Sequence, residues 1–186
     1  YQTDSEISQF NQLRTVNQAM PISQDFAYVT GEALRLNKLT HGALDVTVGP
    51  LVNLWGFGPQ KEITHEPTAQ EIQHASEIVG TDKLKLSQDG QQPTLAKTHP
   101  EVYLDLSSIA KGFGVDKTAA ELEKLNIGNY LVEIGGELHG KGRNAQGNPW
   151  RIGIEQPNIV QGGATQITIP LDNKSLATSG DYRIFH

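Results

Sequence analysis

The sequence predicts an α+β fold in which helices are interspersed with the strands of a mixed or antiparallel sheet. Two early segments carry apolar residues at helical spacing, and after residue 80 the pattern changes to short strands. Helical and strand patterns then follow one another without a regular strand–helix–strand rhythm, which favours α+β over α/β. The chain has 186 residues and no internal repeat, so we expect one compact unit.

Two helices are expected in the first half of the chain. The first covers Ile22 to Lys38, and Gly42 follows it as a stop. Its inward residues are Ile22, Phe26, Val29, Ala33 and Leu36. The second begins at a capping box, in which the Thr68 hydroxyl and the Glu71 carboxylate satisfy free amides, and it ends before Gly80.

Short strands and one further helix are expected after residue 80. Leu84–Leu86 and Val102–Leu104 predict short strands of a hairpin or meander, separated by a turn-rich stretch from Ser87 to Pro93. Ser107 to Asn126 predicts a helix with a buried stripe of Val115, Ala119, Leu122 and Leu125. The later expected strands are Tyr130–Ile134, Trp150–Ile154 and Thr165–Ile169.

Composition excludes several functional classes. There is no Cys, which rules out disulfides, thiolate zinc sites and thiol catalysis. The formal charge of −6 argues against a broad nucleic-acid surface. No apolar run approaches the roughly 18 residues that span a bilayer, and the six His residues lack metal-ligand spacing.

The segment from Gly42 to Pro59 is the first candidate site. It places four glycines and the aromatic residues Trp55 and Phe57 around one acid, Asp45. One interpretation is a structured loop under the core. The other is a glycine-rich wall along which a planar ligand approaches the backbone while Asp45 accepts its hydrogen bonds.

This segment leads to two expectations about substitutions. Replacing Asp45 by Ala is expected to weaken ligand binding with little effect on folding. Gly56 and Gly58 are expected to matter for the fold if they hold positive φ.

The start of the helix at Ser107 is the second candidate site. Amides at a helix N-terminus favour an anion, and Lys111 adds a positive charge beside them, so a phosphate fits there. The alternative is that Asp105 or Ser107 only caps the helix while Lys111 is solvated. Gly112 and Gly114 early in the helix suggest close approach of a backbone or a ligand.

Two further segments carry weaker signals. The glycine pair Gly135-Gly136 stands between two acids and most often marks a turn or a bulge. The segment Ala177–Arg183 supplies hydroxyls, an acid and a guanidinium.

Taken together, these segments resemble the ApbE-type FAD:protein FMN transferase family. Six blocks occur in the order of that family and span nearly the whole chain. They are 4–11, 42–59, 105–116, 132–137, 150–157 and 179–183, of which 42–59 is the most specific.

The resemblance implies roles for individual residues. Ser108 matches a position that gives a backbone oxygen to a metal ion, which is Mg²⁺ in this family. The positions that match FAD-contacting residues are Tyr1, Ala43, Leu44, Asp45, Asp105 and Lys111.

The family activity is transfer of FMN from FAD to a Thr or Ser hydroxyl of a partner flavoprotein, with release of AMP. The resemblance also implies a periplasmic protein tethered to the inner membrane by a lipid anchor, and an acceptor subunit of a membrane redox complex. Family members extend beyond both ends of this chain and carry a His motif and an Asp/Thr pair for the metal. We therefore expect residues 1–186 to be the central part of the domain, with an incomplete metal site and weak turnover.

Two other functions stay open. The first is FAD pyrophosphatase activity, in which water replaces the hydroxyl acceptor and free FMN and AMP appear. The second is a non-catalytic flavin-binding domain.

Overall fold

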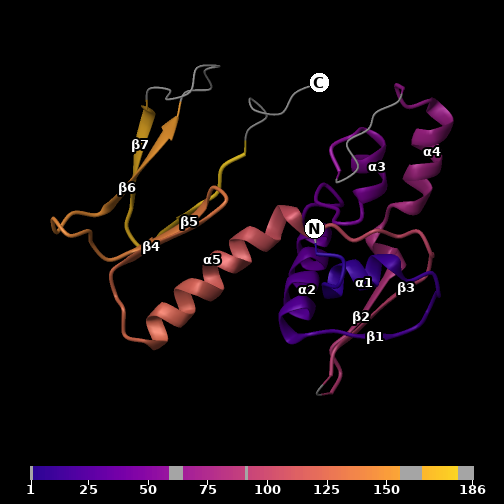
Figure 1. Ribbon diagram of the computed structural model, residues 1–186, viewed down its shortest axis with the longest axis horizontal. Helices are drawn as coiled ribbons and strands as arrows, with labels where there is room; N and C mark the ends of the chain where they lie inside the picture. Colours follow the sequence, from indigo (N-terminus) through magenta and orange to yellow (C-terminus); the bar gives the residue numbers. More distant parts are fainter. Residues whose placement is uncertain (1, 59–64, 91, 156–164, 180–186) are drawn as a thin grey trace. The chain divides into compact units, whose positions relative to one another are not determined.

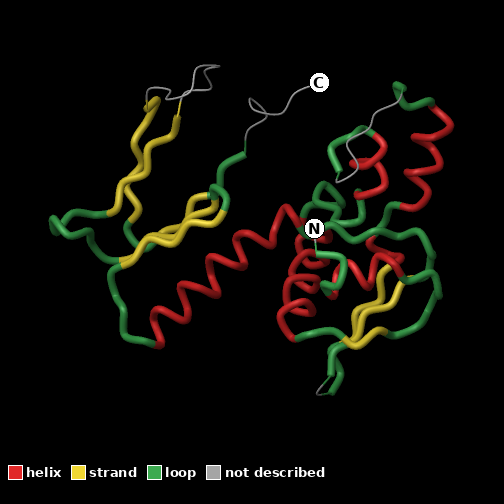
Figure 2. The backbone as a smooth tube through the Cα atoms, viewed as in Figure 1, coloured by secondary structure: helices red, strands yellow, loops and turns green. Residues whose placement is uncertain are grey.

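The computed structural model describes residues 2–58, 65–90, 92–155 and 165–179. Helices and antiparallel sheets alternate along the chain, which confirms the α+β prediction (Figures 1 and 2). In place of the one compact unit expected, the chain forms two, residues 1–109 and 110–186.

The first unit combines four helices, a short 3₁₀ helix and a three-stranded antiparallel sheet in the described part of the chain. The strand order is β1-β3-β2, and Leu86 of β2 faces Leu95 of β3. The elements are α1 (Glu6–Gln12), β1 (Met20–Pro21), α2 (Gln24–Leu39), α3 (Gly49–Leu54), α4 (Ala69–Ile78), η1 (Thr81–Lys83), β2 (Leu84–Ser87) and β3 (Thr94–Lys97).

Both early helices are confirmed, each with the side-chain cap that a free helix end requires. In α2 the Ser23 hydroxyl accepts from the Phe26 amide, and Glu6 of α1 in turn accepts from the Ser23 amide and hydroxyl. In α4 Thr68 and Glu71 form the complete predicted capping box.

The predicted hairpin partner of Leu84–Leu86 is wrong. The strand β2 pairs with β3 (Thr94–Lys97), whereas Val102–Leu104 is not a strand. Val102 and Leu104 are buried, and the backbone of Leu104 is paired by a side chain instead of a neighbouring strand. The Asn11 side chain donates from Nδ2 to the Leu104 carbonyl at 2.9 Å, and its Oδ1 accepts from the Leu104 backbone amide at 2.7 Å. A buried segment of this kind has the alternating apolar pattern of a strand, but it forms no ladder of hydrogen bonds with a neighbouring strand.

The second unit holds most of α5 and the remaining strands. In the described residues the strands form a three-stranded sheet of order β4-β5-β8 and the pair β6-β7, all antiparallel. The elements are α5 (Ser107–Lys124), β4 (Tyr130–Ile134), β5 (Glu137–Lys141), β6 (Trp150–Glu155), β7 (Thr165–Leu171) and β8 (Lys174–Leu176).

All three later strands predicted from the sequence are confirmed, as β4, β6 and β7, but two strands of the second unit were missed, β8 and β5. Its Gly140 suggested a turn, yet it lies inside the strand. A Cβ on Gly140 would lie 2.9 Å from the Leu171 Cβ, so the glycine allows the side chain of Leu171 in β7 to pack closely against β5.

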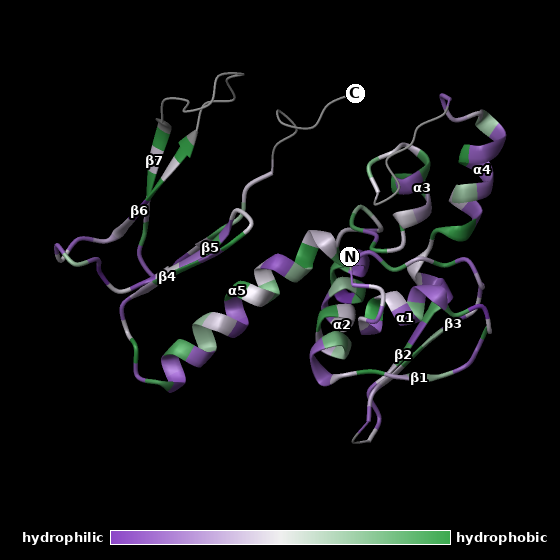
Figure 3. Ribbon diagram, viewed as in Figure 1, coloured by the Kyte–Doolittle hydropathy of each residue, from purple (hydrophilic) through white to green (hydrophobic). Residues whose placement is uncertain are grey.

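The predicted buried stripe of α5 is mostly correct. Val115 and Ala119 pack with Tyr130 and Val132 of β4, with Leu122 partly buried beside them. Polar and apolar residues alternate along the helix (Figure 3). The prediction that Leu125 belongs to this stripe is wrong, because the residue lies beyond the end of α5 and is 69% exposed.

Among the described residues of the first unit, one basic side chain is buried. Lys97 is 1% exposed, and its ammonium donates to the Val102 carbonyl at 3.0 Å and the Asn11 carbonyl at 3.4 Å. The same ammonium lies 5.2 Å from the ring centre of Phe10. Burial, with a smaller contribution from the charge of Arg14, lowers the pKa of Lys97 to about 8.

Lys97 therefore predicts a pH-dependent stability. The unfolded chain holds this proton up to the ordinary pKa of about 10.4, so the folded state releases it first. The free energy of unfolding is expected to rise between pH 8 and pH 10 in the wild type, and this rise is expected to shrink in Lys97→Met. Urea unfolding at several pH values measures it, with Lys85→Met as the exposed-lysine control. An equal pH dependence in wild type and Lys97→Met would contradict the prediction.

Candidate functional site

Proline and glycine residues restrict the backbone of the candidate loop over the described residues 42–58. Pro50 occupies the first turn of α3, where a proline costs no hydrogen bond. Gly56 has φ +74°, which confirms the expected positive φ, whereas Gly58 has none. A Cβ on Gly58 would overlap the Asn53 Oδ1, so a larger residue there would have to displace the Asn53 side chain.

Asp45 is bound into the loop by Thr47. Its Oδ1 accepts from the Thr47 amide at 2.8 Å and from the Thr47 hydroxyl at 2.5 Å. Thr47 is fully buried, and its Oγ1 accepts from the Gly80 amide at 2.7 Å. Because the carboxylate stabilises the loop in this way, Asp45→Ala is expected to lower stability as well as ligand affinity, which revises the expectation of little effect on folding.

Ala43 and Leu44 are held in place by the end of α2. The Ala43 amide donates to the Thr40 carbonyl, and the Leu44 amide donates to the Thr40 hydroxyl, both at 3.1 Å. The Asn37 side chain donates from Nδ2 to the Leu44 carbonyl at 2.7 Å, and the Asn37 Oδ1 accepts from the Thr81 hydroxyl. Ala43 itself is exposed, so its surface is accessible beside the fixed backbone.

Asp105 joins the two candidate segments. Its amide donates to the Val46 carbonyl at 2.7 Å, directly after Asp45 in the chain. Its Oδ1 accepts from the Ser107 amide at 2.8 Å, at the first residue of α5. Asp105 thus has the capping contact that the sequence left open, and the glycine-rich loop and the helix start lie together in the first unit.

A second contact between these segments explains why residue 49 is a glycine. A Cβ on Gly49 would lie 2.3 Å from the Tyr103 Cδ1, so only glycine allows the start of α3 to approach this ring. The approach fixes α3 against the chain that leads to Asp105.

Ser108 and Lys111 are one helical turn apart on α5 and both are exposed. Lys111 is not simply solvated, because its ammonium donates to the Gly135 carbonyl at 3.0 Å and lies 2.7 Å from the Glu137 Oε2. Tyr1 lies outside the described residues, as do Gly180 to Arg183 of the weak C-terminal cluster.

The glycines near this end of α5 have different environments. Gly135 and Gly136 have φ of +57° and +95° and form the two-residue turn between β4 and β5, as predicted. A Cβ on Gly114 would lie 3.0 Å from the Ile134 Cδ1, whereas a Cβ on Gly112 would meet nothing within 4 Å. Gly112 therefore leaves open surface one turn after Ser108.

The described residues supply only part of the ligands that a divalent metal ion needs. No group of three or more His, Asp or Glu side chains suited to a metal occurs in them. The Ser108 carbonyl is an oxygen ligand of the type that Mg²⁺ prefers, but it is one ligand where about six are needed. The residues described here do not by themselves make up a magnesium site.

Comparisons with known proteins place the chain in a family. The sequence profile described as the ApbE family matches residues 1–186. The chain belongs to the ApbE family. The FAD:protein FMN transferase of Haemophilus influenzae is 54% identical to this chain over 185 residues, which are 100% of this chain and 54% of that protein. The FAD:protein FMN transferase of Vibrio cholerae is 50% identical over 98% of this chain and 53% of its own length.

A solved ApbE structure has the same fold. The flavin transferase ApbE from Vibrio cholerae superposes with a TM-score of 0.86 at 47% identity, covering 100% of this chain and 58% of that chain. The chain spans about half the length of the curated ApbE relatives that it matches. Within the described residues, no helix combines the length and apolarity needed to cross a membrane.

Sequence reasoning missed the residues that hold the site residues in place. Thr47 follows Asp45 by two positions, the spacing at which an Asp accepts from a backbone amide, so a signal was present. Asn37 and Asn11 act across long stretches of sequence and gave no local signal.

Thr47→Val tests whether the Thr47 hydroxyl holds the loop through its hydrogen bonds with Asp45 and Gly80. Valine keeps the shape of threonine but removes the hydroxyl between Asp45 and Gly80, so the free energy of unfolding should fall by about 1–3 kcal/mol. Chemical unfolding measures the change, with Thr118→Val on the exposed surface of α5 as the matched control. A loss no larger than that of the control would contradict the anchoring role.

Proposed function

We propose that the protein containing this chain transfers the FMN moiety of FAD to a Thr or Ser hydroxyl of a partner flavoprotein and releases AMP. Membership of the ApbE family supports this reaction, since the relatives named above are FAD:protein FMN transferases. The single observation that carries it in this chain is the hydrogen bond from Asp105 to Val46, which joins the loop of Asp45 to the helix start before Lys111.

The reaction is a phosphoryl transfer. The acceptor hydroxyl oxygen forms a bond to the phosphorus of the FMN moiety, the bond from that phosphorus to the AMP oxygen breaks, and the hydroxyl proton is released. Such reactions depend on positioning and on neutralising charge around the phosphates. Within the first unit, the amides at the start of α5 are suited to the diphosphate, and the polar backbone at Ala43, Leu44 and Asp45 is suited to the rest of FAD. Lys111 matches an FAD-contacting position of the family and is proposed to face the diphosphate.

Mg²⁺ belongs to the same proposal. When bound, it would neutralise charge on the phosphates, and the Ser108 carbonyl would be one of its oxygen ligands. Tyr1 is proposed as an aromatic contact to the flavin nucleotide. A periplasmic location, a lipid anchor and an acceptor subunit in a membrane redox complex are proposed with them.

Transfer is tested with the full-length gene product. Incubated with FAD, Mg²⁺ and an acceptor that carries its target Thr, it should attach FMN covalently to the acceptor and release AMP. An acceptor that stays unmodified would contradict the proposal. Free FMN with AMP would instead indicate a pyrophosphatase, and FAD binding without cleavage would indicate a non-catalytic flavin-binding domain.

Gly112→Ala separates a ligand surface from a structural role. Alanine in a helix interior should raise the free energy of unfolding by about 0.5–1 kcal/mol, because the site has room for a Cβ. If the ligand approaches Gly112, the same change should weaken FAD binding.

Fluorescence titration and chemical unfolding of the same variant give both values. Thr118→Ala, which also raises helix propensity on α5, is the control and should leave the Kd for FAD unchanged. A Gly112→Ala protein with wild-type affinity would remove Gly112 from the binding surface.

A further inference from the structure

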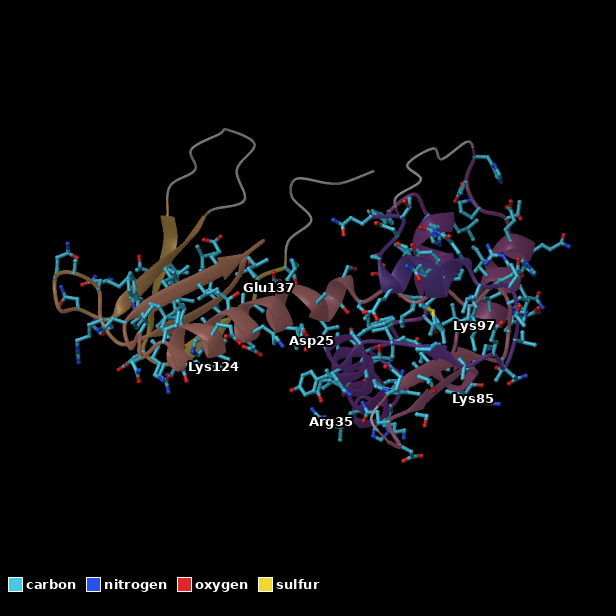
Figure 4. The ribbon with its side chains drawn as sticks, turned by 60° about the horizontal axis from the view of Figure 1, so that its bottom comes forward. Asp25, Arg35, Lys85, Lys97, Lys124 and Glu137 are labelled. Carbon is cyan, nitrogen blue, oxygen red and sulfur yellow. The ribbon has the colours of Figure 1, made fainter. Side chains whose placement is uncertain are left out.

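The ion pair between Lys111 and Glu137 lies entirely within the second unit. Glu137 is the first residue of β5 and lies beside α5 (Figure 4). The inference below rests on the proposed function, in which Lys111 faces the diphosphate of FAD.

The Lys111 ammonium has two partners of different kinds. It donates a hydrogen bond to the Gly135 carbonyl at 3.0 Å and contacts the Glu137 Oε2 by charge at 2.7 Å. That oxygen is shielded from solvent, and within the described part of the chain it accepts no hydrogen bond of good geometry. The Glu137 side chain is 18% exposed and that of Lys111 45%. Among the described residues, the Lys111 ammonium is therefore the charged group that holds this oxygen.

The turn between β4 and β5 makes this contact possible. Gly135 has φ +57°, and a Cβ there would lie 3.0 Å from the Lys111 Cδ, so the glycine allows the lysine stem to cross the turn. On the other side, the Thr178 hydroxyl donates to the Gly136 carbonyl at 3.3 Å. Contacts from α5 and from the segment after β8 thus fix the turn, and with it the first residue of β5.

We propose that Glu137 is an internal counter-anion of Lys111, which the diphosphate of the bound nucleotide displaces. A lysine ammonium is a compact charge, and its interaction with an anion falls off with distance. A diphosphate carries more negative charge than a carboxylate and competes for the same ammonium. The Lys111 side chain is 45% exposed, so water already screens part of its attraction to Glu137 and a second anion can reach the ammonium. Glu137 is in this sense a positioning residue that also lowers affinity for the nucleotide.

Glu137→Gln tests this exchange in the full-length gene product. Glutamine keeps the size of the side chain but removes the competing charge, so the Kd for FAD should fall about two- to fivefold, the range that a partly screened ion pair allows. Riboflavin, which has no phosphate, should bind wild type and variant alike. Glu133→Gln removes the same charge from an exposed position on β4 and should have a smaller effect.

The Lys111→Met background supplies the decisive comparison. If Glu137 acts through Lys111, Glu137→Gln should produce no tightening of FAD binding in Lys111→Met. A residue with only a structural role would not tighten binding, and its effect would not depend on Lys111. Circular dichroism melting of each variant verifies folding.

Three results would overturn the inference. These are an unchanged or raised Kd in Glu137→Gln, an equal tightening in the Lys111→Met background, and an equal tightening in Glu133→Gln. Failure of the proposed function is a different result, in which the wild-type protein binds neither FAD nor inorganic pyrophosphate.

Discussion

The hydrogen bond from the Asp105 amide to the Val46 carbonyl connects the two segments on which the candidate site depends. It places Asp45, in a glycine-rich loop, next to the residue that caps α5 through Ser107. Neither segment could hold this arrangement by itself, because a loop of small residues loses much conformational entropy when it becomes ordered. The site is thus a property of the contact between the segments.

Buried polar contacts of the first unit stabilise the chain segment that leads to Asp105. Asn11 satisfies both backbone groups of Leu104, and the Lys97 ammonium binds the Val102 carbonyl and the end of α1. These contacts replace the ladder of a strand in the buried chain that leads to Asp105. The two carbonyl oxygens reduce the cost of burying the Lys97 ammonium, although burial still lowers the pKa of Lys97 to about 8.

The sequence predicted the elements whose signals are local. The capping box at Thr68, the period of α2 and the glycine pair at Gly135 were all identified correctly, since each depends on residues within one or two turns. The pairing of β2 was wrong because the alternation at Val102–Leu104 reports burial and not hydrogen bonding. The same limit applies to the site: residues 42–59 and 105–116 were identified as candidates, whereas the Glu137 partner of Lys111 depends on a contact 26 positions away in sequence.

Hydrogen exchange of the full-length gene product with and without FAD tests the central claim most directly. If the loop and the helix start form one nucleotide site, FAD should slow exchange in peptides covering 42–58 and 103–112 together. The β2–β3 hairpin at 84–97, which is outside the proposed site, should not change. Protection confined to one of the two segments, or to neither, would contradict the claim that their contact creates the site.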